Sequence, residues 1–128
     1  MNAFLSLGRW LFPVPFAAFG LIHLLNAQVM ADNVVPAYMP AKIVWVYLSG
    51  LGLIAAAVSM YLGKYDKLAA TLLAVFLLFV ILMVHLPGAM SGGEGAQTSV
   101  SMVLRDLGMM AGAMIYALHL AIDRSVVG

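Results

Sequence analysis

The feature that most constrains this chain is a set of four long apolar runs separated by short polar stretches. The runs cover residues 7–30, 43–62, 68–86 and 100–122. Each has about 20 residues, enough for a helix to cross a hydrocarbon core of roughly 30 Å. Because a segment in lipid must satisfy its own backbone hydrogen bonds, the pattern predicts an all-α fold. We expect one integral membrane four-helix bundle over residues 1–128.

Composition agrees with this prediction, since 65% of the residues are hydrophobic and only 9% are charged. A soluble domain of this size does not bury that much apolar surface. The first run is also about twice as long as the apolar part of a typical signal peptide. We therefore interpret it as a membrane span.

Basic residues predict the orientation of the bundle. Four of them, Arg9, Lys64, Lys67 and Arg124, flank the runs on the side of the two termini, and two, Lys42 and Arg105, fall on the other side. Loops rich in lysine and arginine stay in the cytoplasm. The sequence thus predicts a multi-pass protein with both the N- and the C-terminus on the cytoplasmic side.

Charge and cysteine content exclude several classes of function. The formal net charge is +1 and no basic run is present, so we do not expect nucleic acid as a partner. The chain has no cysteine, which excludes disulfides, thiolate metal sites and cysteine nucleophiles within it. No self-contained catalytic set is recognisable, and any redox role would need a borrowed electron carrier.

Five polar side chains are predicted to lie at one depth in the outer part of the bundle: His23, Asn26, His85, Arg105 and Asp106. A polar group in lipid needs a partner or a water-filled cavity, so these residues form the candidate ligand-binding site. The alternatives are structural, namely histidines that act as hydrogen-bonded struts and an ion pair between Arg105 and Asp106. No tight metal-ligand spacing is present, and we predict no metal site.

The last run carries a stripe of small and polar residues on one helical face. Its members are Arg105, Gly108, Gly112, Tyr116, His119 and Asp123. We expect the stripe to face the interior of the bundle. Gly108 and Gly112 form a Gly-x-x-x-Gly pair, which favours close helix packing in the bundle or in a homo-oligomer.

Three segments give the chain a resemblance to a known family. They are Gly8–Arg9 followed by FGLIHL at residues 19–24, VPAYMP at 35–40 leading to VYLSG at 46–50, and LRDLG at 104–108. In order and spacing they resemble the DoxX family of small bacterial four-span membrane proteins. The resemblance implies a multi-pass protein of the bacterial cytoplasmic (inner) membrane. It also implies association with quinone-linked oxidation of sulfur compounds, or with assemblies that handle oxidative and thiol stress.

The preferred functional hypothesis is an accessory or ligand-binding subunit of a membrane redox assembly that holds a quinone or a lipid. Arg105 and a histidine would bind a head-group oxygen, while Phe16, Phe19 and nearby methionines would surround the apolar ring. Two alternatives stay open. One is a transporter or channel for a small solute or protons, and the other is a membrane scaffold that binds no ligand.

Overall fold

The structure, a computed structural model, describes residues 1–128 and contains helices and loops without strands. Four stretches are long and apolar enough to cross a membrane: Asn2–Leu25, Lys42–Leu62, Asp66–Met90 and Ala96–Leu120. The predicted all-helical chain with four helices of spanning length is confirmed at this level.

The first stretch is divided at two points without a change of direction. It consists of α1 (Asn2–Ser6), α2 (Gly8–Leu11) and α3 (Pro13–Leu25). Pro13 is the first residue of α3, where its missing N–H costs least, and it accounts for the division between α2 and α3. The junction residues Leu7 and Phe12 keep helical φ and ψ values, so the helical path continues through both junctions.

The first stretch ends earlier than its apolar run, which reaches residue 30. Asn26 leaves the helical region with φ −122° and ψ 30°, and a separate helix α4 (Ala27–Asn33) follows. The side-chain nitrogen Nδ2 of Asn26 donates to the Ile22 carbonyl at 3.1 Å. A side chain that competes for backbone partners in this way favours a helix end.

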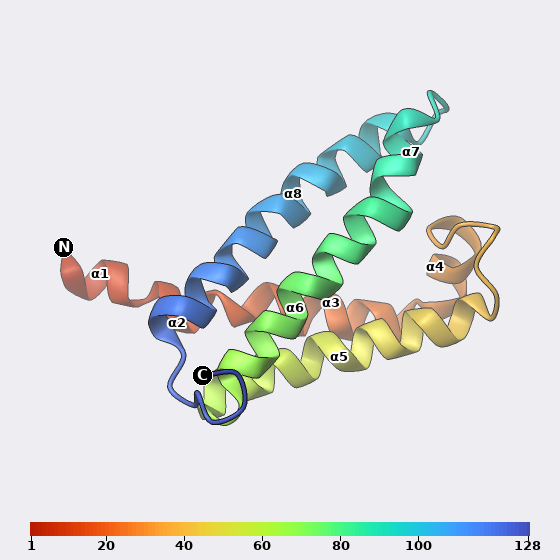
Figure 1. Ribbon diagram of the computed structural model, residues 1–128. Coiled ribbons are helices and arrows are strands. Elements are labelled where there is room, and N and C mark those ends of the chain that lie inside the picture. Colours follow the sequence, from red (N-terminus) through yellow and green to blue (C-terminus); the bar gives the residue numbers. More distant parts are fainter.

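The helices form two arms that meet at one end and separate at the other (Figure 1). The first arm pairs α3 with α5 (Lys42–Leu62) and carries α4. The second arm consists of α6 (Asp66–Val80), the π-helical turn η1 (Ile81–His85), α7 (Leu86–Met90), α8 (Ala96–Ile115) and the π-helical turn η2 (Tyr116–Leu120). We call the end with the α5–α6 turn, η2 and residues 121–128 the closed end. The end with α4, residues 34–41 and α7 is the open end.

Two glycines bring the helices of the first arm into backbone contact. A Cβ atom on Gly20 would lie 2.7 Å from the Gly50 carbonyl oxygen, and one on Gly50 would lie 2.9 Å from the Gly20 carbonyl oxygen. No real side chain tolerates such a distance to backbone. This reciprocal pair is therefore the small-residue contact that sets the separation of α3 and α5.

A core of 13 buried residues joins the two arms. Its members are Phe16, Leu53, Ala56, Ala57, Met60, Ala70, Leu73, Ala74, Leu77, Ala113, Tyr116, Ala117 and Ala121. Seven of these residues are alanines, which let the helix backbones approach closely. A separate cluster of Ala27, Ala31 and Val46 fixes α4 against α5.

Candidate functional site

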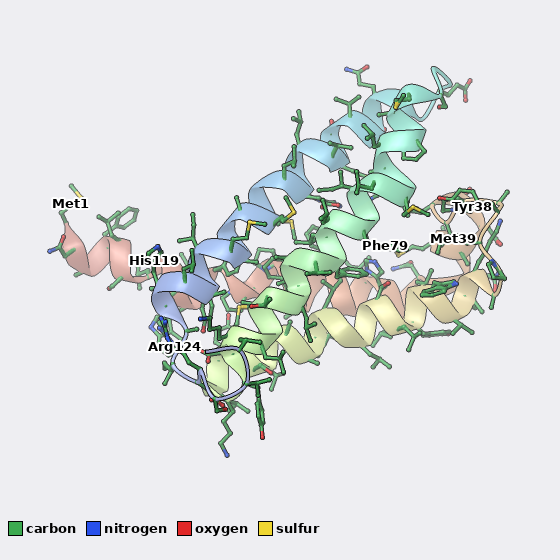
Figure 2. All side chains as sticks on the ribbon, in the orientation of Figure 1. Met1, Tyr38, Met39, Phe79, His119 and Arg124 are labelled. Atoms are coloured by element: carbon green, nitrogen blue, oxygen red, sulfur yellow. The ribbon has the colours of Figure 1, made fainter.

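A cavity of about 660 Å³ lies between the arms, and 17 of its 22 lining residues are hydrophobic. Its walls come from α3, α4, α5, α6, η1, α8 and the 34–41 connection. Figure 2 labels Tyr38 and Met39 on that connection and Phe79 on α6, on the two sides of the open end; Met39 and Phe79 line the cavity. The volume is in the range of pockets that hold drug-sized ligands.

Four of the five predicted site residues line this cavity: His23, His85, Arg105 and Asp106. The fifth, Asn26, is exposed and does not line it. The amide of Asn26 is occupied by the Ile22 carbonyl at the end of α3. The structure thus brings together the two histidines and the Arg–Asp pair, and it assigns Asn26 to the helix end.

Asp106 is the centre of the polar group and is only 2% exposed. Its Oδ1 atom accepts a hydrogen bond from Arg105 Nε at 3.1 Å, and its Oδ2 atom lies 3.4 Å from Nε2 of His85. A buried carboxylate requires such partners because its desolvation is costly. Both partners themselves line the cavity, so the whole group is available to a ligand.

Arg105 reaches from the second arm to the first. Its Cζ atom lies 4.8 Å from the centroid of the Phe19 ring on α3, a distance typical of a cation–π contact. Only Nε of its guanidinium donates to a protein group, the Asp106 carboxylate. The two terminal nitrogens, which carry most of its donors, make no hydrogen bond within the chain, and the residue lines the cavity.

His23 has a defined tautomer. Its Nδ1 atom lies within hydrogen-bond distance of the Phe19 carbonyl. A carbonyl oxygen only accepts, so Nδ1 carries the proton, and in the neutral ring Nε2 becomes an acceptor. Arg105 and His23 both line the cavity, so Arg105 supplies donors and a neutral His23 ring supplies an acceptor at its wall.

The 34–41 connection closes part of the open end. The Tyr38 hydroxyl donates to the Met83 carbonyl in η1, which joins the two arms a second time. Pro87 follows Met83 by one helical turn and has no N–H to give to that carbonyl. Trp45 Nε1 donates to the Pro40 carbonyl at 2.8 Å, and this contact fixes the connection to the start of α5.

The predicted stripe on the last run faces inward only in part. Its member Tyr116 is buried and Gly112 is half-buried, whereas Arg105, Gly108 and His119 are exposed. Asp106 and Ala113, which lie next to stripe positions, are buried in their place. The sequence does not show which of the two adjacent charges, Arg105 or Asp106, turns inward.

The two glycines of the last run lie in different surroundings. A Cβ on Gly112 would lie 2.6 Å from the Phe12 ring, so this glycine makes room for an aromatic side chain. A Cβ on Gly108 would meet nothing within 4 Å. Within one chain, only Gly112 of this pair supports a close contact.

The closed end contains a second buried carboxylate that sequence reasoning placed in a short connection. Asp66 is fully buried and accepts from Ile122 N at 2.8 Å, Asp123 N at 2.8 Å and the Tyr116 hydroxyl at 3.1 Å. The backbone N–H of Lys67 adds a fourth donor. These bonds use the acceptor positions of the carboxylate, so Asp66 is a structural residue.

Arg9 and Asp123 make further polar contacts at the closed end. Arg9 donates to the Leu120 carbonyl at 2.7 Å and lies 3.9 Å from Asp66. Asp123 accepts from the Ser125 hydroxyl at 2.6 Å and from Tyr65 N at 2.7 Å. The Ser125 hydroxyl, followed by the Tyr65 N–H, holds the pKa of Asp123 below its usual value.

Comparison with known proteins identifies a family. A model described as a domain of unknown function, DUF8561, matches residues 12–121. The chain belongs to this family. No curated protein and no solved structure matches it.

The expected membership of the DoxX family is wrong, because the matching family is a different one and no DoxX match accompanies it. The three segments behind that expectation are short and combine apolar residues with glycine, a composition that recurs in membrane helices. The association with sulfur oxidation and with a redox assembly loses its basis with the resemblance.

Proposed function

We propose that this protein binds a lipid-soluble small molecule with a polar head, of the quinone class, inside the membrane. The observation that carries the proposal is the cavity between the arms, in which His23, His85, Arg105 and Asp106 gather within apolar walls. A large apolar pocket with a few convergent polar groups is the usual form of a ligand site. Clustered ionisable groups at membrane depth also favour a functional role.

The polar groups match the two oxygens of a quinone or hydroquinone head. The terminal nitrogens of Arg105 donate to a carbonyl oxygen, and Nε2 of His23 accepts from a hydroxyl group. Asp106 holds the Arg105 side chain by its Nε atom, which directs the remaining donors. Phe19, Phe76 and Met109 supply apolar surface for the ring.

The proposal includes a membrane location and an orientation. The four helices of spanning length are taken to cross the bacterial cytoplasmic membrane. Arg9, Lys64, Lys67 and Arg124 belong to the closed end, which we assign to the cytoplasmic side by the positive-inside rule. The cavity then lies in the outer half of the membrane.

The decisive experiment is native mass spectrometry of the purified protein, followed by extraction and identification of the bound small molecules. We expect a stoichiometric quinone in the wild-type protein. Arg105→Ala should reduce the occupancy about tenfold or more, because a charge-assisted hydrogen bond contributes about 1.5–3 kcal/mol. The helical content, measured by circular dichroism, should not change.

Lys64→Ala is the matched control, because it also removes one positive charge but from the exposed closed end. It should keep full occupancy. If only bulk phospholipid is extracted from the wild-type protein and from Lys64→Ala, the quinone proposal is contradicted. Solute or proton flux into proteoliposomes that requires Arg105 would instead support a transporter.

A further inference from the structure

A second hollow of about 450 Å³ adjoins the cavity. It lies along α5 and α6, and 11 of its 14 lining residues are hydrophobic. The cavity and this hollow share four lining residues: Trp45, Ser49, Leu53 and Phe76. We call the second hollow the α5–α6 groove. The shared side chains place the groove directly beside the cavity.

We propose that the α5–α6 groove receives the hydrocarbon tail of the ligand whose polar head lies in the cavity. This inference rests on the proposed function and specifies the ligand class further, as a molecule with a long tail. No residue that lines the groove carries a charge, whereas the cavity contains Arg105, Asp106 and two histidines. The two hollows thus divide the polar and apolar parts of one molecule.

The shape of the groove suits a narrow, flexible chain. Ser49, Gly52, Ala56 and Ser59 contribute small side chains from α5, at spacings of one helical face. Leu68, Leu72 and Phe76 form the opposite wall on α6. From Ser49 to Ser59 the helix rises roughly 15 Å, which is comparable to an extended decyl chain.

Gly52 offers a way to fill the groove without disturbing the fold. A Cβ atom on Gly52 would meet nothing within 4 Å, so a larger side chain there enters open space. Gly108 is also a helical glycine whose Cβ would meet nothing within 4 Å, and it lines neither hollow. Gly52→Leu and Gly108→Leu therefore form a matched pair.

The experiment measures binding of two quinones to the full chain in lipid nanodiscs. One is decylubiquinone, and the other is the same dimethoxy-methyl-benzoquinone head without the decyl tail. Gly52→Leu should weaken decylubiquinone binding about tenfold. The leucine side chain would occupy space that the bound tail needs, and such overpacking costs roughly that much binding free energy. Tailless quinone binding should not change. Gly108→Leu should alter neither affinity.

Leu72→Trp fills the groove from α6 and provides a second test, since Leu72 is 58% exposed. It should also act on decylubiquinone alone. Unchanged decylubiquinone binding in both variants, or equal losses for both quinones, would overturn the assignment of the tail to the α5–α6 groove. The proposed binding of the head in the cavity would be unaffected. Failure of the wild-type protein to bind either quinone would instead refute the proposed function.

Discussion

The closed end and the cavity each contain one buried aspartate, and the two carboxylates have opposite surroundings. Asp66 at the closed end is 0% exposed and accepts from four donors in α6, η2 and the residues that follow. Asp106 in the cavity is 2% exposed and has only the side chains of Arg105 and His85 as partners. Equal burial therefore does not indicate equal roles. The number and rigidity of the partners separate a structural carboxylate from one available to a ligand.

The largest effect should come from removing the closed-end carboxylate. Asp66→Ala leaves the N–H groups of Ile122 and Asp123 and the Tyr116 hydroxyl without their acceptor. We expect the free energy of unfolding to fall by about 3–5 kcal/mol. Titration with sodium dodecyl sulfate in mixed micelles, followed by circular dichroism, measures this value.

Asp106→Ala should cost about half as much in the same titration, because its partners can turn towards the cavity. Asp32→Ala, at an exposed residue that accepts only from Gln28, is the control and should change the value by less than about 0.5 kcal/mol. Equal losses for Asp66 and Asp106 would remove the distinction between the two carboxylates.

An intermediate effect is expected where the 34–41 connection joins η1. Tyr38→Phe removes the hydrogen bond to the Met83 carbonyl, which contributes about 1 kcal/mol. Hydrogen–deuterium exchange of residues 34–41 should become about fivefold faster, while residues 63–67 at the closed end stay unchanged. Tyr47→Phe, at an exposed tyrosine on α5, should leave both segments as they are. Equal acceleration at both ends would show that the ends open together.

The smallest effect concerns acid sensitivity at the closed end. The pKa of Asp123 is lowered from 3.8 by the Ser125 hydroxyl and the Tyr65 N–H. Its stabilising contribution is therefore present above the unfolded-state pKa and is lost as the pH falls through the folded-state pKa. Asp123→Asn should melt slightly below the wild-type protein at neutral pH, and the difference should vanish well below 3.8. A difference that persists in acid would contradict this assignment.

Hydropathy predicts the number of long helices well, because the length of an apolar run is a local property of the sequence and a helix satisfies the backbone hydrogen bonds within that run. It does not predict where the helical hydrogen-bond pattern is interrupted. The run through residue 30 contains the break at Asn26, which a hydropathy profile does not show, since Ala27, Val29 and Met30 are as apolar as the helix before them.

The candidate site was predictable in composition but not in geometry. His23, His85, Arg105 and Asp106 were grouped as polar residues in apolar runs, and all four line the cavity. Contacts between distant segments, such as Tyr38 with Met83, left no signal except Pro87. Asp66 was missed because Lys64 and Lys67 make its surroundings look like an ordinary exposed turn.

The hydrogen bonds of Asp66 also impose an order on assembly during synthesis. Its carboxylate belongs to α6, but three of its four donors belong to Tyr116, Ile122 and Asp123. The chain leaves the ribosome N-terminus first, so the Asp66 carboxylate lacks these three donors until the last of the three residues has been made. The closed end is therefore completed last, and a chain released before residue 122 would keep Arg9 beside the Asp66 carboxylate but would lack two of the backbone donors that stabilise it.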